Sequence, residues 1–309
     1  MLSILLPTYN YDVQPLVHDL LHQARQLNIP FEIVVEDDAS PNAKLCSENH
    51  SLVMEPEVTY VQHHYNMGRS KIRNHLAQAA HYPYLLFLDC DAGMKQSNFI
   101  SQYVQYIRFH QNPEHPFVVL GGVAYREMTP DPAFRLRWKY GIAREQKTAA
   151  IRNISPYRSF TPFNMLVSKT VFEKVSFDEN FTQYGFEDTF FGYQLHQNEI
   201  QVSHIDNEMY HDGLDSNAGY VDKVMCAVDN LAALYAEHKL PADFVQDSRL
   251  LQTYLRCKKL YMAGIVGFML KLLQRPLRWC AVRFSSLTAL DLLKLGRLTA
   301  ALKRVTNRT

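Results

Sequence analysis

The sequence has few of the features that mark a secreted, membrane-spanning or zinc-binding chain. Its five cysteines are scattered and form no C-x-x-C pair, which argues against a disulfide framework or a zinc knuckle. The longest apolar run, residues 260–270, is too short to cross a bilayer as a helix. The opening MLSILLPTYN has neither a basic segment nor a small-residue cleavage site, so we expect no secretory signal and a cytoplasmic location.

Nucleotide-binding fingerprints are missing too. The sequence has no G-x-x-x-x-G-K-[ST] loop and no G-x-G-x-x-G turn, which argues against a P-loop hydrolase and a dinucleotide-binding enzyme. It also lacks internal repeats and low-complexity segments. Its 309 residues are 47% hydrophobic and 20% charged, which is the balance of a globular chain with one large or two modest domains.

Charge is distributed unevenly along the chain, although the net charge is only +1. From Arg249 onward there are thirteen Lys and Arg residues and one acid, whereas the preceding residues hold 19 basic and 30 acidic ones. We expect a body over residues 1–215 and a basic helical extension over 216–309. Basic, leucine-rich helices are typical of contact with an anionic membrane surface; a lid on the acidic body and a dimer interface are the alternatives. No nucleic-acid-binding signature occurs in them.

The first hundred residues alternate between strand and helix patterns. Short apolar runs predict strands at residues 3–7, 31–35, 58–62 and 84–88, and another at 117–120 beyond them. Apolar residues at helical spacing predict helices at 13–24, with Asp12 as its cap, and at 70–80, and a later helix is predicted from Lys169. This alternation predicts an α/β fold with a mostly parallel sheet. Polar residues just past strand ends line the ligand crevice of such sheets, and three clusters lie there: Thr8-Tyr9-Asn10, residues 36–40, and Asp89-Cys90-Asp91.

Two of these clusters are acidic. Asp89 and Asp91 follow a fully apolar strand, and two carboxylates at that spacing suit a hard divalent cation that also bridges phosphates. Residues 36–38 are three consecutive acids, so a carboxylate there is a candidate partner for a nucleobase N–H, and Ser40 is a candidate cap for a short helix. In both clusters a solvated acidic turn is the alternative.

Three further segments carry candidate chemistry. Gly68 permits a tight turn before a predicted helix. The backbone N–H groups at the start of that helix, together with Arg69 and Arg73, suit an anion; the alternative is an ordinary basic helix start. Glu187 and Asp188 lie at the start of a predicted helix. They are candidates for a general base; the alternative is that the helix dipole simply favours acids in the first turn. His211 is a candidate metal ligand, although a lone histidine is more often structural.

In this order, PTYN, DDAS, N-x-G-x-x-x-x-R-N, L-D-x-D and GFEDTFFGYQL resemble the motifs of the inverting glycosyltransferases of family 2. The resemblance covers about residues 2–211 and implies the GT-A fold, with a Rossmann-like, mostly parallel central sheet flanked by helices and a C-terminal helical extension. It implies transfer of a hexosyl or N-acetylhexosaminyl group from a nucleotide-sugar, most commonly a UDP-sugar. The implied acceptor is a hydroxyl of a glycan or lipid-linked molecule in surface polysaccharide or glycoconjugate synthesis.

Family roles carry over by position. Nucleotide-sugar binding is implied for Pro7, Thr8, Tyr9, Asn10, Asp38, Gly68, Arg69, Arg73 and Asp89. The ligands implied for Mn²⁺ or Mg²⁺ are Asp89, Asp91 and His211. Asp188 matches the catalytic base, with Glu187 beside it. The sequence departs from the family at Cys90, between the two aspartates, and at residues 183–186, where the Gly/Trp-rich approach on the acceptor side is reduced.

Two rival functions stay open at this stage. A non-catalytic nucleotide-sugar-binding or scaffolding subunit would have the same fold, although every position that the chemistry needs holds a competent residue. A nucleotidyltransferase would have a glycine-rich basic loop after its first strand, where this chain has Pro7-Thr8-Tyr9-Asn10. The expected setting is the cytoplasm, with peripheral contact to the inner face of the cell membrane.

Overall fold

The computed structural model describes residues 1–109, 115–181, 185–237 and 239–306, which form two compact units. The first unit holds Met1–Arg126 and, except for residues 185–186, the described residues from 145 to 213. The second holds Glu127–Arg144, residues 185–186 and the described residues from 214 onward. Gln183 and Tyr184, on the expected acceptor side, lie outside the described residues.

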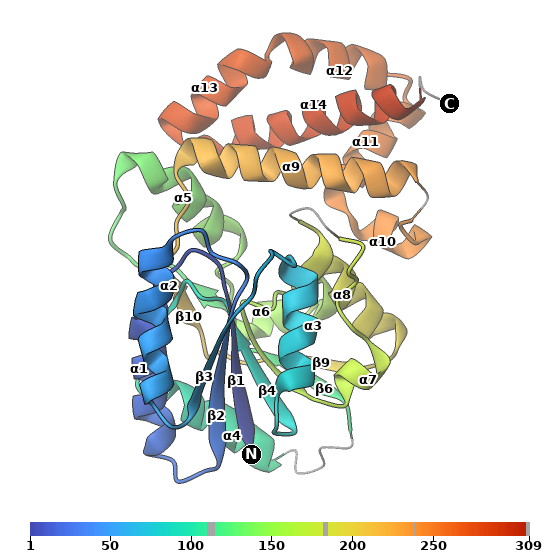
Figure 1. The fold of residues 1–309 in the computed structure, drawn as a ribbon. Coiled ribbons are helices and arrows are strands. Elements are labelled where there is room, and N and C mark those ends of the chain that lie inside the picture. The colour runs from blue at the N-terminus through green and yellow to red at the C-terminus, as the bar shows by residue number, and fades with distance from the viewer. Residues whose placement is uncertain (110–114, 182–184, 238, 307–309) are drawn as a thin grey trace. The chain divides into compact units, whose positions relative to one another are not determined.

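The first unit is built on a seven-stranded sheet in the order β3-β2-β1-β4-β8-β6-β9 (Figure 1). These strands are β1 Leu2–Thr8, β2 Phe31–Asp37, β3 Val58–Gln62, β4 Tyr84–Leu88, β6 Phe117–Leu120, β8 Asn164–Ser168 and β9 Gln201–His204. Every pairing is parallel except those of β8 with β4 and β6. The prediction of a mostly parallel sheet is therefore confirmed.

A second, three-stranded sheet forms from segments far apart in the sequence. Its order is β5-β10-β7, with β5 at Ala92–Gly93, β7 at Val123–Ala124 and β10 at Met209–His211. The β10–β5 pairing is antiparallel and sets His211 opposite Ala92, one residue after Asp91. The sequence analysis missed this sheet because strands of two or three residues have too few positions to show alternation.

Helices flank the central sheet, with α3 in front of it and α4 behind it in Figure 1. The α-helices of this unit are α1 Gln14–Arg25, α2 Ala43–His50, α3 Arg69–Ala79, α4 Phe99–Phe109, α6 Ala149–Asn153, α7 Val171–Lys174 and α8 Glu187–Gln197. The apolar faces of α3 and α8 share one core with the sheet, in which Leu76, Phe87 and Phe191 are almost fully buried. This packing fixes the start of each helix beside the carboxyl ends of the strands.

Two predicted helix caps are wrong. Asp12 does not cap α1, whose cap residue is Val13, although the Asp12 carboxylate accepts the N–H of Gln14 at 3.0 Å. Ser40 does not cap α2; Asn42 does, because its Oδ1 accepts the N–H of Leu45. At α2 the tertiary path of the chain decides which of the preceding polar residues is used, whereas at α1 the cap residue makes no side-chain cap bond.

The second unit is helical in all its described secondary structure beyond residue 216, as the sequence predicts. Its α-helices are α5 Arg135–Arg144, α9 Asn217–Ala236, α10 Ala242–Asp247, α11 Arg249–Lys259, α12 Ala263–Leu272, α13 Gln274–Phe284 and α14 Leu287–Thr306. Leu136, Val221 and Leu290 form part of its own core. None of the helices that the structure describes is both long and apolar enough to span a membrane.

Candidate active site

Asp91 and His211 meet where the central sheet and the small sheet adjoin. Asp91 follows β4, and the β10–β5 pairing brings His211 beside it, so that Nε2 of His211 lies 3.8 Å from Oδ2 of Asp91. The His211 ring stacks on both Tyr125 and Phe163, with centroid distances of 5.8 and 5.4 Å. Two aromatic rings and a strand therefore fix the direction in which the imidazole points.

The chain after His211 closes tightly over Asp91. The N–H of Asp212 donates to the carbonyl of Asp91 at 3.0 Å. A Cβ atom at Gly213 would overlap the carboxylate of Asp91, so only glycine leaves that carboxylate in place. Gly213 is a site residue that the sequence analysis missed, because its importance depends on a contact across more than a hundred residues.

Arg73 connects the two ends of the candidate site. Its side chain is almost fully buried, and Nη2 donates to Oδ1 of Asp89 at 2.8 Å. On its other side, Nη1 lies 3.5 Å from Oδ1 of Asp188, and neither of these two atoms has a hydrogen-bond partner within the described residues. One guanidinium thus joins the acid after β4 to the acid that opens α8.

A second, looser ion pair lies beside the first. Arg69 Nη1 is 3.6 Å from Oε1 of Glu187, whose side chain is buried. Arg69 and Arg73 are four residues apart, hence on the same face of α3. Glu187 and Asp188 stand in the first turn of α8. The two helix starts therefore bring two cations and two anions together.

Asp89 and Asp188 differ in their protonation. Burial raises the pKa of Asp89, but the positive charges of Arg73 and Arg69 more than offset this, and its pKa is lowered. At Asp188, burial and the neighbouring Glu187 raise the pKa to about 7, against the opposing effect of Arg73. Asp89 thus stays an anion, whereas Asp188 exchanges a proton near neutral pH.

Asp38 holds a loop in place. Its carboxylate accepts the N–H groups of Met67 and Gly68 at 2.6 and 3.0 Å, and its carbonyl accepts from the Asn66 side chain. Gly68 has φ +82°, a conformation that favours glycine, and nothing lies within 4 Å of a Cβ built there. The carboxylate therefore sets the turn that starts α3 and with it the positions of Arg69 and Arg73.

Glu36 and Asp37 are also engaged. Asp37 is buried and accepts from the Ser40 N–H and the Tyr60 hydroxyl, at 2.7 and 3.0 Å. Glu36 is 1% exposed; Nε2 of His63 lies 3.0 Å and Nδ1 of His75 2.8 Å from its oxygens. These three side chains offer atoms within 4.8 Å of one another, which makes them a second group able to hold a metal ion.

The end of β1 lies between these clusters. The Thr8 carbonyl accepts the N–H of Asp38, and the N–H of Asn10 donates to Oγ of Ser40. Pro7 is half-buried, the Tyr9 side chain is exposed, and Asn10 has φ +51°. Burial and the nearby Asp91 raise the pKa of Tyr11 to about 12, so its phenol stays protonated. Tyr11 was missed because it lies beyond the motif.

Cys90 lies between the two aspartates. Burial and the charge of Asp91 raise the pKa of its thiol to about 12, so without a bound metal the side chain is a neutral thiol.

Comparisons with known proteins identify the family of this chain. The family description "Glycosyl transferase family 2" matches residues 3–176. Chondroitin synthase of Pasteurella multocida (strain Pm70) is 28% identical over 63% of this chain and 23% of its own length. Validoxylamine A glucosyltransferase of Streptomyces hygroscopicus subsp. limoneus is 31% identical over 66% of this chain and 49% of its own. The chain thus spans less than half the length of these relatives.

A solved structure supports the fold. The mannosyltransferase PcManGT from Pyrobaculum calidifontis, in complex with GDP-Man and Mn²⁺, superposes with a TM-score of 0.51 at 16% identity. The match covers 99% of this chain and 86% of that one. The predicted GT-A fold is confirmed. Because the family match extends over more than half of its residues, this chain is a member of glycosyl transferase family 2.

Proposed function

We propose that the chain transfers a hexosyl or N-acetylhexosaminyl group from a nucleotide-sugar to an acceptor hydroxyl, with inversion at the anomeric carbon. The observation that carries this proposal is the bridge through Arg73, which joins Asp89 and Asp188 in one cluster. The acid that binds the donor and the base that deprotonates the acceptor must lie about one sugar apart if the acceptor is to attack the donor's anomeric carbon.

The residues present suit a hard divalent cation, Mn²⁺ or Mg²⁺. Asp91 and His211 supply an oxygen and a nitrogen 3.8 Å apart, close enough for two ligands of one ion with bonds of about 2 Å. Gly213 leaves the space that Asp91 needs. Asp89 is the third candidate, although one of its oxygens is bonded to Arg73. When bound, the ion would neutralise negative charge on the departing diphosphate.

Asp188 is the proposed base. The acceptor O–H bond breaks as Asp188 takes the proton, the acceptor oxygen bonds to the anomeric carbon, and the bond to the diphosphate breaks with its electron pair. A single displacement from the opposite face inverts that carbon. A pKa near 7 suits this role, because the carboxylate is ionised at neutral pH and still basic enough to accept a proton. The positive charges of Arg73 and Arg69 stabilise the Asp188 carboxylate and the negative charge on the departing diphosphate.

The donor is proposed to be a UDP-sugar, as the resemblance implies, with its base near the carboxyl ends of β1 and β2. The Asp38 carboxylate keeps lone pairs for a base N–H in addition to the two backbone N–H groups that it accepts. The Asp38 N–H donates to the carbonyl of Thr8, and Tyr9 and Asn10 follow Thr8 in the sequence. PcManGT was solved with GDP-Man, so a guanine nucleotide is the competing donor class.

The acceptor is proposed to be a glycan or a lipid-linked molecule in surface polysaccharide or glycoconjugate synthesis, in the cytoplasm. Peripheral contact with the inner face of the cell membrane belongs to the same proposal. Its support is the basic charge of the C-terminal helices, which hold one acid from Arg249 onward.

The test is nucleotide release by the purified full chain from a panel of UDP-, GDP- and dTDP-sugars with Mn²⁺. We expect released UDP, no pyrophosphate, and a product of inverted anomeric configuration by NMR. Asp188→Asn should lower turnover by about 10³-fold, the middle of the range for general base catalysis, with donor affinity within a few-fold of wild type. Asp19→Asn, which removes an exposed acid from α1, is the control and should leave turnover unchanged.

Three results would contradict the proposal. Wild-type turnover in Asp188→Asn would remove that residue from the role of base. Release of pyrophosphate would identify a nucleotidyltransferase. Donor binding with Mn²⁺ but no turnover on any acceptor would favour the non-catalytic subunit.

A further inference from the structure

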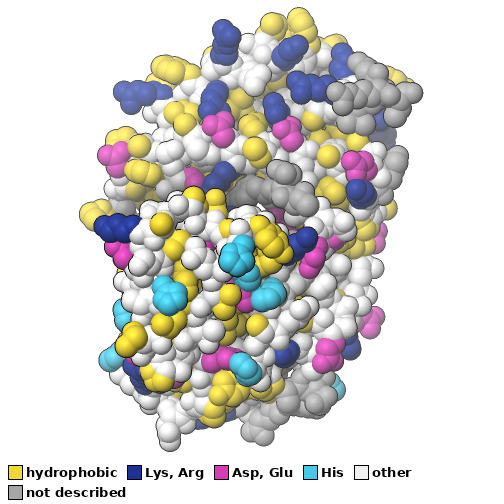
Figure 2. Space-filling model, in the orientation of Figure 1, with side chains coloured by type: hydrophobic (Ala, Val, Ile, Leu, Met, Phe, Trp, Pro, Cys, Tyr) yellow, Lys and Arg dark blue, Asp and Glu magenta, His cyan; other side chains and the backbone are white. Residues whose placement is uncertain are grey.

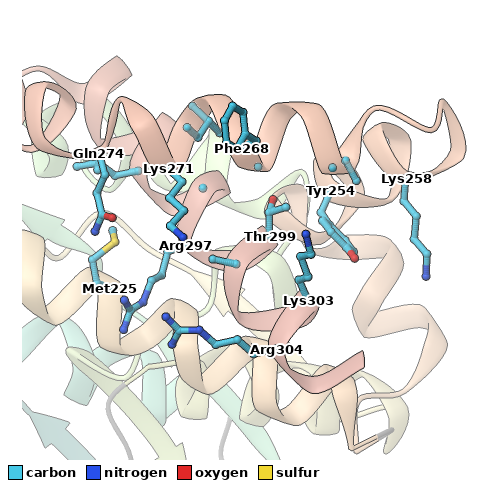
Figure 3. A pocket seen from close by; sticks show the side chains of 17 residues that line it. Met225, Tyr254, Lys258, Phe268, Lys271, Gln274, Arg297, Thr299, Lys303 and Arg304 are labelled. Carbon is cyan, nitrogen blue, oxygen red and sulfur yellow. The ribbon is translucent and has the colours of Figure 1, made fainter. Parts of the chain in front are cut away.

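The second unit contains a pocket among α9, α11, α12 and α14, with a volume of about 640 Å³ (Figure 3). This is the size of pockets that bind small molecules. Much of its wall is made of small or apolar residues, among them Gly264, Gly267, Leu270 and Gly296. No acidic residue belongs to the wall as far as the structure describes it.

Cations gather at this pocket. Lys258, Lys271, Lys303 and Arg304 line it, and within the described part of the chain none of them forms an ion pair. In Figure 3, Lys271 reaches from α12 toward the helix that carries Lys303. A fifth cation, Arg297, is already paired with Asp229. A ligand that satisfies both the wall and its cations combines an anionic group with an apolar chain.

The outer surface beside the pocket is apolar to an unusual degree. On α12, Ile265 is 66% exposed, Phe268 62% and Leu272 63%, and Trp279 on α13 is 59% exposed. Figure 2 shows hydrophobic and Lys or Arg side chains next to one another over these helices. Exposed apolar residues interleaved with cations are typical of helices that lie in the surface of an anionic bilayer.

Pocket and surface are continuous, because Phe268 and Lys271 belong to the pocket wall and are also exposed on α12. The glycines at 264 and 267 leave the backbone of α12 without side chains toward the pocket. A molecule held at this surface by its apolar chain can therefore place its charged group among the lysines.

We propose that this pocket binds one anionic phospholipid of a bilayer, with its phosphate among Lys271, Lys303 and Arg304 and its acyl chain along Gly264 and Phe268. The apolar face of α12 and α13 enters the surface of the same bilayer. This inference rests on the proposed membrane contact and is independent of the transferase activity.

The direct probe is a short-chain lipid in monomeric form, titrated into the full chain by calorimetry. Dihexanoyl-phosphatidylglycerol is expected to bind at least tenfold more tightly than dihexanoyl-phosphatidylcholine and than inorganic phosphate. Gly264→Leu fills the pocket; a Cβ there meets nothing within 4 Å, and leucine favours the helix. We expect this variant to fold, to be at least as heat-stable as wild type, and to lose at least five-fold in affinity for phosphatidylglycerol.

Flotation with vesicles separates the pocket from the surface. A double variant, Ile265→Ser with Leu272→Ser, alters exposed residues outside the pocket wall. It should lose flotation with vesicles of 30% phosphatidylglycerol in phosphatidylcholine yet keep its short-chain affinity. Lys44→Gln in the first unit, which removes an exposed positive charge, is the control and should change neither readout.

Three outcomes would overturn the lipid site. They are equal affinity for the two short-chain lipids, equal affinity for inorganic phosphate, and wild-type affinity in a folded Gly264→Leu. If flotation persists in these cases, membrane contact stands without a lipid in the pocket. If the wild-type chain does not float with anionic vesicles even at low salt, the membrane contact itself is wrong.

Discussion

The acids after β2 and the acids after β4 flank the same strand, β1, and look alike in the sequence. In the structure they differ. Glu36, Asp37 and Asp38 are all buried, and each has at least two protein partners. Asp91 keeps its side chain 24% exposed, and Nε2 of His211 lies 3.8 Å from its Oδ2.

This difference separates carboxylates that stabilise the fold from one that is partly exposed at the candidate site. The carboxylates after β2 accept hydrogen bonds within the protein and stabilise turns and helix starts, while Asp38 keeps lone pairs for a donor base and Glu36 belongs to a group able to hold a metal ion. The site formed by Asp91, His211, Arg73 and Asp188 holds buried polar atoms without hydrogen bonds, such as Nη1 of Arg73 and Oδ1 of Asp188 among the described residues. Polar atoms of this kind are costly unless a ligand satisfies them, which favours a binding role for this cluster.

Alanine substitution of one acid from each cluster tests the comparison most strongly. Asp91→Ala should lower Mn²⁺-dependent turnover by about 10³-fold and leave the free energy of unfolding within about 1 kcal/mol of wild type. Asp37→Ala should instead lower the free energy of unfolding by about 3 kcal/mol, because the Ser40 N–H and Tyr60 hydroxyl lose their acceptor. Urea unfolding and turnover, both measured on each variant, check this. Equal destabilisation by the two substitutions would remove the distinction.

A smaller effect is expected at Gly213. In Gly213→Ala the new methyl group displaces the Asp91 carboxylate, so we expect Mn²⁺ affinity to fall by about 10- to 100-fold. Stability should fall as well, because the new atom would lie 2.5 Å from Cβ of Asp91, which only a main-chain shift can move. Gly264→Ala, where nothing lies within 4 Å of the new atom, is the matched control. Mn²⁺ titration of donor binding measures both, and identical curves for Gly213→Ala and wild type would contradict the packing argument.

The smallest effect is a change of stability with pH. The Asp188 carboxyl has its pKa raised to about 7 when folded, compared with about 4 in an unfolded chain. Its contribution to stability is therefore full below pH 4 and is lost as pH rises through 7. Relative to wild type, the free energy of unfolding of Asp188→Asn should rise by about 2 kcal/mol from pH 4.5 to pH 8. This is less than the full pKa shift implies, because the Asp188 side chain is 31% exposed. A pH-independent difference, measured without metal, would contradict the raised pKa.

Much of the frame was predictable because it depends on local patterns. Strands β3, β4 and β6 have the predicted bounds, and β2 is two residues longer at its C-terminus, where Glu36 and Asp37 continue the ladder beside β3. Apolar runs that end in polar residues identify buried strands reliably. The helix predicted from Lys169 is only the short α7, because its apolar periodicity ends after one turn.

The sequence by itself determined the α/β frame, the basic helical extension and the set of candidate residues at the strand ends. Tertiary structure alone decided which of these residues meet. The pairing of β10 with β5 brings His211 to Asp91, and the packing of α3 beside α8 lets Arg73 reach both Asp89 and Asp188. The physical reason is separation along the chain. Periodicity reports a residue's neighbours within one helix or strand, whereas an ion pair across more than a hundred residues exists only once the core has packed.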